Sequence, residues 1–265
     1  MNDSSRKANR FQAFFRSGAY VLLKNHLYNY RLRQKAVTSL LPPDNAGWTV
    51  EVGTGISPIC LPGARTVYTD LSFTGMRSLK AAMPEGHYVV ADGTALPFKG
   101  RSVSRCVCSE VIEHIADDLL ALREMARILP PGGRCFITFP HRTAYFAHDD
   151  VYVHHHRRYD LADISRKLNR AGFSSKGIHK VLGPLEKITM VAVTRLASLT
   201  DRRKPRRSLP DMPPAAARLV EFAFKWGNRL FSLPVRLDAK LMPRSMSSVL
   251  LIEAVRDGDE TIFRG

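Results

Sequence analysis

The sequence contains no uninterrupted apolar run close to the roughly 20 residues that a membrane-spanning helix requires. No apolar core segment follows the early basic residues, so a secretory signal is not expected. The chain has only four cysteines, Cys60, Cys106, Cys108 and Cys135, and none has the paired spacing of a metal site. Cys106 and Cys108 would share one face of a strand, which is poor geometry for a disulfide. We therefore expect a reduced, cytoplasmic protein without a bound metal.

Acidic residues are scarce relative to basic ones, since 24 Asp and Glu stand against 40 Lys and Arg and give a net charge of +16. Two segments hold most of this excess: residues 1–40 carry a net +7, and residues 183–245 carry a net +8. A positive excess confined to two segments favours an anionic partner, either a membrane surface or a nucleic acid. A solvated basic surface without a partner is the alternative.

Strand-like and helix-like segments alternate from about Trp48 to Phe173, which predicts a parallel sheet with crossover helices. Helices are predicted at 117–129 and from Asp160 to just before Gly172. The expected strands are 48–52, 66–70, 87–91, 104–109, 134–139, 174–182 and 247–255. We expect three parts: a basic helical arm at 1–44, an α/β domain at 45–182 and 246–265, and a basic insertion at 183–245.

The insertion is predicted to contain an amphipathic helix at 213–233. One face carries basic residues and the other is mostly apolar; the basic residues are Arg218, Lys225 and Arg229, and the apolar ones Leu219, Phe224, Trp226, Leu230 and Phe231. Such a helix could rest in the interface of a bilayer, with its basic face near lipid phosphates. It could equally pack as a lid on the α/β domain.

Three predicted strands each carry an acid near the end: Glu51, Asp70 and Asp92. Because the carboxyl ends of parallel strands meet at one edge, where open α/β sheets bind ligands, we expect the three carboxylates to surround one site. Asp70 can accept both hydroxyl protons of a ribose, and Asp92 lies where it could contact an adenine edge. The pattern predicts a cofactor that contains a nucleoside.

Two glycines, Gly53 and Gly55, follow the first of these acids. Glycines there would let the backbone approach a ligand closely, and a following helix start would offer free N–H groups. A dinucleotide fingerprint needs a third glycine at position 58, where this chain has Pro58. The cofactor is therefore expected to be of another kind.

The chain resembles the class I S-adenosylmethionine-dependent methyltransferases, particularly the type 11 group that includes quinone-biosynthesis enzymes. The segments that carry the resemblance are Val50–Gly55, Tyr68–Asp70, Ala91–Phe98, Ser109–Ile115 and Leu129–Gly133. The resemblance implies a Rossmann-like, seven-stranded, mostly parallel sheet with helices on both faces and an antiparallel last strand. In this chain the N-terminal helical arm and the helical insertion before the last strand would be additions to that fold.

S-adenosylmethionine is the cofactor that the resemblance implies. The implied binding residues are Glu51, Gly53, Thr54, Gly55, Asp70, Leu71, Asp92, Gly93, Ser109 and Glu110. Two features depart from the family pattern. Ser57 replaces a glycine, and the first crossover helix, between Gly55 and Arg65, is expected to be very short because it contains Pro58 and Pro62.

Methyl transfer needs a base only when the acceptor must lose a proton. Candidates are His141 from the sequence and, from the resemblance, His155 and Tyr159 in a His-x-Arg-x-Tyr segment beyond the fifth strand. His114 either packs at the start of the following helix or faces the substrate. A metal held by the histidines from His141 to His156 is disfavoured, because side chains of consecutive histidines diverge.

The predicted function is a methyltransferase acting on a small-molecule or lipid-linked acceptor, with an anionic membrane surface as a candidate partner. An RNA methyltransferase is the alternative, favoured by a pI of about 10.1. Nucleic acid is the less favoured partner, because the basic tracts lack regularly interleaved aromatic residues. A non-catalytic binding module that keeps the fold is the third hypothesis. The acceptor and the oligomeric state are not indicated.

Overall fold

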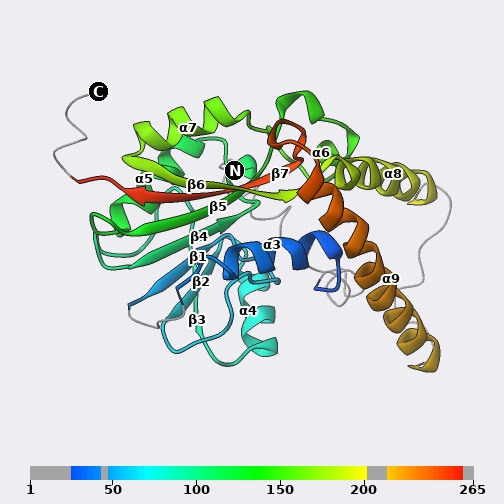
Figure 1. The fold of residues 1–265 in the computed structure, drawn as a ribbon. Helices are drawn as coiled ribbons and strands as arrows, with labels where there is room; N and C mark the ends of the chain where they lie inside the picture. Colours follow the sequence, from blue (N-terminus) through cyan, green and yellow to red (C-terminus); the bar gives the residue numbers. More distant parts are fainter. Residues whose placement is uncertain (1–24, 43–46, 202–213, 259–265) are drawn as a thin grey trace.

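The computed structural model describes residues 25–42, 47–201 and 214–258. Its centre is a seven-stranded sheet with the strand order β3-β2-β1-β4-β5-β7-β6 (Figure 1). β1 to β5 run parallel, and β7 is antiparallel to both β5 and β6. The strands are β1 (Thr49–Val52), β2 (Thr66–Asp70), β3 (His87–Val90), β4 (Arg105–Ser109), β5 (Arg134–Pro140), β6 (Phe173–Leu182) and β7 (Val249–Arg256). The predicted sheet, with its antiparallel last strand, is confirmed.

The helices cover both faces of this sheet. They are α3 (Tyr28–Thr38), α4 (Phe73–Ala82), α5 (Asp118–Ile128), α6 (His148–Tyr152), α7 (Leu161–Arg170), α8 (Pro184–Asp201) and α9 (Pro214–Leu241). Short 3-10 helices are η1 (Ile112–His114), η2 (Thr143–Tyr145) and η4 (Arg244–Met246). α5 begins where its cap predicts, because the Asp117 side chain accepts a hydrogen bond from the Leu120 N–H. α7 begins after Asp160 and ends before Gly172, as predicted, although the Asp160 side chain makes no capping hydrogen bond.

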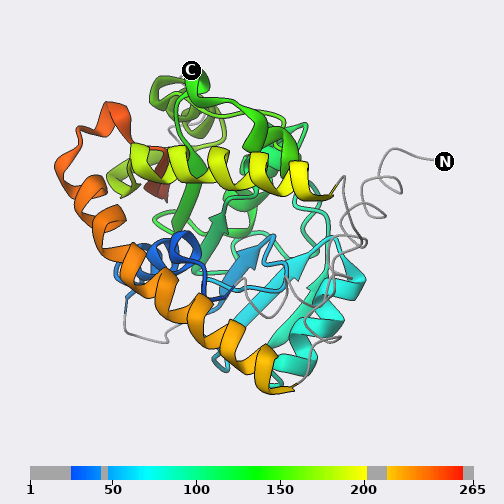
Figure 2. The ribbon, with the colours of Figure 1, turned by 90° about the vertical axis from the view of Figure 1, so that its right-hand side faces the viewer.

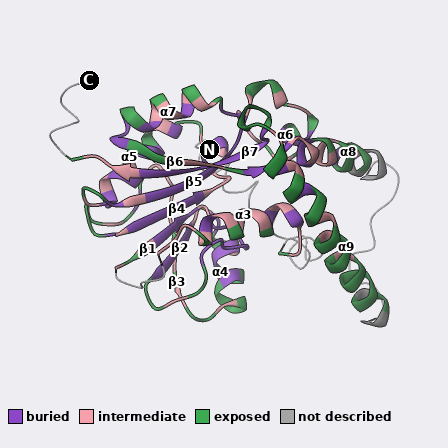
Figure 3. Cartoon of the chain, in the orientation of Figure 1, coloured by how far each residue is buried: buried purple, intermediate pink, exposed green. Residues whose placement is uncertain are grey.

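The inner strands of the sheet are mostly buried on both sides, as a sheet covered on two faces requires, whereas the edge strands β3 and β6 are more exposed. In β4, Cys106 and Cys108 face the core under α5 and α7, whereas Val107 faces the core under α3, α4 and α9. Figure 3 shows that burial is concentrated in the inner strands of the sheet, such as β4, β5 and β7. All four cysteines are buried and free, which agrees with the predicted absence of disulfides.

The insertion forms α8 and α9, which extend past the carboxyl ends of the parallel strands. Figure 2 shows α8 along one side of these strand ends and α9 along another. α9 continues to Leu241, beyond the predicted end at 233. The basic run at 202–207 and most of the predicted N-terminal arm lie outside the described residues. Among the residues described, no helix is both long and apolar enough to cross a membrane.

α9 has two apolar faces rather than the single one predicted. Phe231 packs edge-on against Tyr28 of α3, with ring centroids 5.1 Å apart, and Val235 is fully buried. The second face, which we call the apolar ridge, has side chains that are 44–67% exposed. The apolar ridge consists of Leu219, Phe222, Trp226, Leu230, Leu233, Leu237 and Leu241. The predicted apolar face is thus divided, since Phe231 faces the domain whereas Leu219, Trp226 and Leu230 face solvent.

Candidate cofactor and acceptor site

The tips of β1 and β2 are tied together by hydrogen bonds at the expected cofactor edge. The Gly53 N–H donates to the Thr69 carbonyl at 2.8 Å, and the Gly55 N–H donates to Asp70 Oδ2 at 2.8 Å. Asp70 Oδ1 accepts from the Ser72 N–H at 2.8 Å, just before α4 begins. Asp70 is therefore fixed at the end of β2 beside the bare backbone of the first loop, and its side chain is only partly buried.

Glycine is needed at position 53 for two reasons, the backbone conformation and the lack of space for a side chain. Its φ of +72° lies in the left-handed region, and a Cβ there would come within 2.4 Å of Val111. Thr54, next to it, is buried, with its hydroxyl 3.3 Å from the Glu51 carbonyl. Gly93, after β3, is also closely packed: a Cβ would lie 3.2 Å from Ile115 and 3.4 Å from Val52.

Gly53→Ala is expected to lower the free energy of unfolding by about 2 kcal/mol, because it adds a steric overlap to a left-handed backbone. Gly132→Ala is the matched control, since Gly132 has a φ of +78° with no atom within 4 Å of the added Cβ. That variant should lose only about 1 kcal/mol. Urea unfolding measures both, and equal losses would show that contact with Val111 is unimportant.

The loop that follows β1 differs from the prediction. Residues 53–65 contain no helix, so the expected short crossover helix and its free N–H groups are absent. Instead the carboxylate of Glu51, which is 2% exposed, accepts hydrogen bonds from the N–H groups of Ile59 and Cys60 at 2.7 and 2.8 Å. Pro58 has no N–H to donate to a helix, and the buried Glu51 takes over the organisation of the loop. Its carboxylate is thus bound by the loop that follows β1, and a part for Glu51 in cofactor binding stays a prediction.

Asp92 and Leu71 complete the outer part of this edge. Asp92 Oδ1 accepts from the N–H and the hydroxyl of Thr94, at 2.9 and 2.8 Å, which fixes the turn after β3. Leu71 directly follows Asp70 and is partly buried. β3 pairs with β2 so that Val90 lies opposite Asp70, which brings the turn at Asp92 next to the tip of β2.

The end of β4 supplies Ser109 and Glu110. The Ser109 hydroxyl lies 2.8 Å from that of Thr138 on β5. Glu110 has a φ of +54°, an unusual conformation for a residue other than glycine, and its buried Oε1 has no hydrogen-bond partner among the described residues. A strained backbone that carries an unpartnered carboxylate oxygen at a strand tip is typical of a ligand site.

Of the predicted base candidates, His155 has the geometry of an oriented imidazole. Its Nδ1 lies 2.8 Å from Asp150 Oδ1, which leaves Nε2 facing Glu113 at 3.7 Å. Burial tends to raise the pKa of Asp150, but hydrogen bonds from His155 and Arg158 outweigh it and hold that pKa below its ordinary value. Asp150 therefore stays ionised and fixes the ring of His155.

Tyr159 is placed differently from the prediction. It is fully buried, and its hydroxyl lies 2.8 Å from Asp118 Oδ2 and 3.1 Å from the Ile112 carbonyl. Burial and the neighbouring Asp118 charge raise the pKa of this phenol. We correct its assignment from a base in the acceptor pocket to a core residue that supports the wall of the site.

His141 is also largely enclosed. Its Nδ1 lies 2.9 Å from the Ser247 carbonyl, and burial is the main cause that lowers its pKa. A role for His141 toward the acceptor stays a prediction. Arg157, from the same predicted segment as His155, donates to Asp118 at 2.8 Å and to the Ala116 carbonyl at 2.9 Å.

The structure adds Glu113, which the sequence analysis did not select. Glu113 is fully buried, and neither carboxylate oxygen has a hydrogen-bond partner among the described residues. Burial raises its pKa, followed by the charge of Glu110. Donor atoms of Glu113, His114 and His155 all lie within 4.8 Å of one another, a set that could hold a metal ion. The divergence of neighbouring histidine side chains does not argue against this set, because its members come from two separate segments. Glu113 and His114 lie in η1, whereas His155 lies in the segment after α6.

A buried ionic network attaches the insertion to the site, and it also escaped the sequence analysis. Lys187 of α8 is 7% exposed, and its Nζ lies 2.5 and 2.7 Å from the two oxygens of Asp149 and 2.7 Å from Asp150 Oδ2. Arg158 Nε donates to Asp150 Oδ1 at 2.8 Å. Because Asp150 also orients His155, α8 is coupled to the candidate base through one carboxylate.

Comparison with known proteins agrees with this geometry. Residues 50–137 match the model of a methyltransferase domain family. An uncharacterized methyltransferase of Mycobacterium sp. strain JLS is 41% identical over 64 residues, 24% of this chain and 25% of that protein. A demethylmenaquinone methyltransferase of Streptomyces griseus is 29% identical over 126 residues, 43% of this chain and 55% of that protein. The matches therefore span only about a quarter to a half of these relatives.

Solved structures show the same fold. An S-adenosylmethionine-dependent methyltransferase from Thermotoga maritima aligns with a TM-score of 0.56 and 15% identity, over 89% of this chain and 91% of that one. The segment matched by the family model runs from β1 into β5, which includes the tips that carry Asp70, Asp92 and Glu110. Residues 50–137 are thus similar to a methyltransferase domain family, in agreement with the resemblance that the motifs indicated.

Proposed function

We propose that this protein is an S-adenosylmethionine-dependent methyltransferase acting on a small-molecule or lipid-linked acceptor. The observation that carries the proposal is Asp70, a partly buried carboxylate fixed at the tip of β2 beside the bare backbone of Gly53 and Gly55. This arrangement fits an adenosyl group, because a carboxylate can accept both ribose hydroxyls while the glycines keep the neighbouring space open. When bound, S-adenosylmethionine supplies an electrophilic methyl group on a sulfonium.

The remaining cofactor contacts are proposed from their places around Asp70. Leu71, Asp92 and Gly93 would border the adenine, whereas Thr54, Ser109 and Glu110 lie toward the methionine end. Glu51 acts through the loop that it shapes. The unpartnered Glu110 Oε1 is an acceptor suited to an ammonium group.

His155 is proposed as the base that takes a proton from the acceptor. Asp150 holds Nδ1, so Nε2 is the nitrogen that can receive a proton, and the ionised Asp150 would stabilise the resulting imidazolium. Positioning supplies the rest of the rate, since methyl transfer is an in-line displacement.

The lipid-linked class of acceptor is favoured by the surroundings of the strand ends. α8 and α9 border these ends (Figure 2), and both helices expose large apolar side chains, among them Ile188 and Leu196 of α8, which are 65% and 64% exposed. Exposed apolar surface next to a ligand site suits an apolar substrate or a membrane. We propose a cytoplasmic protein that works peripherally on a membrane.

The function is tested by methyl transfer from radiolabelled S-adenosylmethionine into lipid extracts, small-molecule extracts and RNA. Label in the lipid or small-molecule fraction is expected. Label in RNA would support the RNA methyltransferase instead, and cofactor binding without transfer to any fraction would support a non-catalytic module.

His155→Gln is expected to lower the rate of methyl transfer by about 10² to 10⁴-fold, the usual contribution of a general base. The Kd for S-adenosylmethionine should stay within about threefold of the parent value, because His155 does not contact the proposed adenosine site. His156→Gln is the matched control, since this exposed neighbour lies one position along the chain. A rate loss equal in both variants would contradict the assignment of His155.

A further inference from the structure

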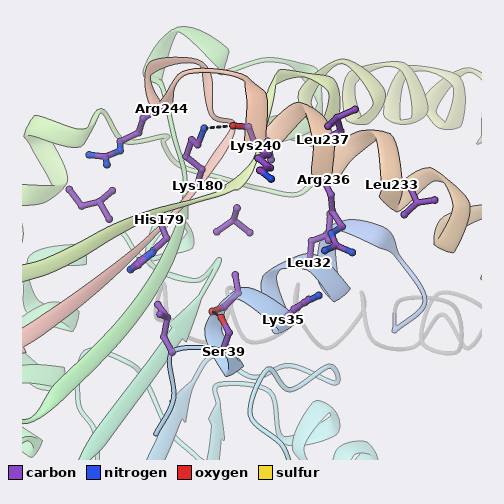
Figure 4. A pocket seen from close by; sticks show the side chains of 15 residues that line it. Leu32, Lys35, Ser39, His179, Lys180, Leu233, Arg236, Leu237, Lys240 and Arg244 are labelled. Carbon is purple, nitrogen blue, oxygen red and sulfur yellow. Dashed lines mark hydrogen bonds between the residues drawn. The ribbon is translucent and has the colours of Figure 1, made fainter.

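A large hollow lies outside the candidate site, between α3, β6 and the C-terminal half of α9 (Figure 4). Its volume is about 1160 Å³, and it continues into a second hollow of about 580 Å³ between α3 and α9. The two share Leu32, Lys35, Leu233 and Arg236, so we treat them as one surface, the α3–α9 groove.

The lining of the α3–α9 groove is strongly basic. Lys35, Lys180, Arg236, Lys240 and Arg244 line the larger hollow, and Arg31 and Arg229 are added in the smaller one. Neither lining contains an aspartate or a glutamate. Asp238, on the same half of α9, is turned toward α8, where its carboxylate accepts from the Leu185 N–H at 3.0 Å. Seven cations without an acid in the lining favour an anionic ligand.

Hydrogen-bond donors within the groove are also fixed in place. Lys180 Nζ donates to the carbonyls of Lys240 and Met242 at 2.8 and 2.7 Å, which holds its charge at the end of α9 (Figure 4). His179 lines the same hollow, and its buried Nε2 has no hydrogen-bond partner within the described residues. A phosphate oxygen is a suitable partner for the ammonium of Lys180, whereas the Nε2 of His179 is buried and is not offered to a ligand in the hollow.

The apolar ridge of α9 runs beside this basic lining. Leu233 and Leu237 belong to the ridge and also line the larger hollow, at 60% and 57% exposure. Arg229, Arg236 and Lys240 follow each other at intervals of seven and four residues, which places them in a stripe adjacent to the ridge. Cations next to exposed leucines suit a ligand with an anionic head and apolar chains.

We propose that the α3–α9 groove binds the phosphate headgroups of anionic phospholipids while the apolar ridge enters the acyl region of the same leaflet. The biological role of this membrane contact rests on the proposed function, because an enzyme with a lipid-linked acceptor must reach a membrane. Its chemistry is independent of the cofactor site. A nucleic-acid backbone would also match the charges, but leucines occupy five of the seven ridge positions, Phe222 and Trp226 being the two aromatic residues of the ridge, and a surface made mostly of leucine suits acyl chains better than stacked bases.

The test is co-sedimentation of the full chain with vesicles of phosphatidylglycerol and phosphatidylcholine in equal parts. The double variant Lys35→Gln and Arg236→Gln should bind about 30-fold more weakly than the parent, at about 1 kcal/mol for each basic residue near an anionic surface. The matched control removes two exposed cations of α7 through Arg166→Gln and Arg170→Gln, and should change binding by less than about threefold.

A second double variant, Leu233→Ser and Leu237→Ser, keeps the charge and tests the ridge. It should lose at least about tenfold in vesicle binding, because exposed leucines contribute only when they enter an apolar phase. Both pairs lie on exposed positions, and circular dichroism melting verifies that the variants fold. Equal binding by the parent and the groove variant would overturn the proposal. So would an unaffected leucine variant combined with single-stranded RNA binding that depends on Lys35 and Arg236.

Calorimetry with S-adenosylmethionine separates this proposal from the proposed function. Cofactor binding should be unchanged in both double variants. Vesicle binding that behaves as expected in a protein that binds no cofactor would leave the groove proposal standing and overturn the methyltransferase proposal. If the parent binds the cofactor but has no affinity for anionic vesicles, the groove proposal is overturned and the methyltransferase proposal stands.

Discussion

Asp70→Ala is expected to weaken the binding of S-adenosylmethionine by about 100-fold or more. Two hydrogen bonds from ribose hydroxyls to a carboxylate contribute about 1.5–3 kcal/mol each, and about 1.4 kcal/mol corresponds to a factor of ten. The substitution also removes the acceptor of the Gly55 and Ser72 N–H groups. The loop therefore loses its hydrogen-bonded attachment to β2. Titration calorimetry with the cofactor measures the effect.

Two further variants make this result specific. Asp70→Asn keeps an acceptor for the Gly55 N–H but loses the charge, so we expect a smaller loss of about tenfold. Asp163→Ala removes a carboxylate from the exposed surface of α7, where the side chain is 41% exposed, and should leave binding unchanged. Binding by Asp70→Ala within threefold of the parent would remove the main support for the cofactor site.

Lys187→Met is expected to lower the free energy of unfolding by about 3–5 kcal/mol, the usual cost of leaving a buried partner charge uncompensated. Lys187 is the ammonium that neutralises Asp149 and Asp150 beneath α8, and both carboxylates are buried. Equilibrium unfolding in urea measures the loss. Methyl transfer should also fall, because Asp150 orients His155.

Lys176→Met is the matched control for this variant. Lys176 also lies near a carboxylate, 3.6 Å from Glu253, but its side chain is 61% exposed. Exposed pairs contribute only about 0–1 kcal/mol, so the control should lose little. Similar losses in the two variants would show that burial of the network at α8 does not determine its strength.

The pH dependence of the Lys187 effect follows from the pKa of Asp150, which is held below its ordinary value of 3.8. A carboxyl group with a depressed pKa in the folded state stabilises the fold above its ordinary pKa and loses that contribution as the pH falls. The difference between the parent and Lys187→Met should therefore be largest near neutral pH. It should shrink as the pH drops below about 4, and a difference that grows in acid would contradict the assignment.

Local sequence signals were sufficient for the elements of the domain. β1 to β5 and α5 were predicted within about two residues, because β-rich runs, Asp117 as a cap and the Pro130 to Gly133 turn act on their own neighbourhoods. The cofactor edge followed from the same signals, since parallel strands must end together. The cofactor roles of these residues stay predictions, and a family match to residues 50–137 supports them.

The sequence was a poorer guide to the surroundings of individual side chains, because these depend on residues that are distant in the chain. The sequence did not indicate the partners of Glu51, because alternation along β1 turns it to the face where the distant Ile59 and Cys60 N–H groups need an acceptor. Tyr159 was expected in a pocket and is enclosed with Asp118. The helix after Gly55 is absent because Pro58 and the buried Glu51 favour a turned loop.

The sequence by itself determined the sheet, its cofactor edge and the position of a basic, apolar insertion, because periodicity, caps and strand-end acids are properties of contiguous residues. Only the tertiary structure decided which groups come together across long separations. Lys187 meets Asp150, and His155 meets Glu113, over intervals of tens of residues. Packing of α9 also decided which apolar side chains were buried and which formed the ridge, since both faces carry the same kinds of residue and the contacts with the domain, such as that of Phe231 with Tyr28 and the burial of Val235, distinguish them.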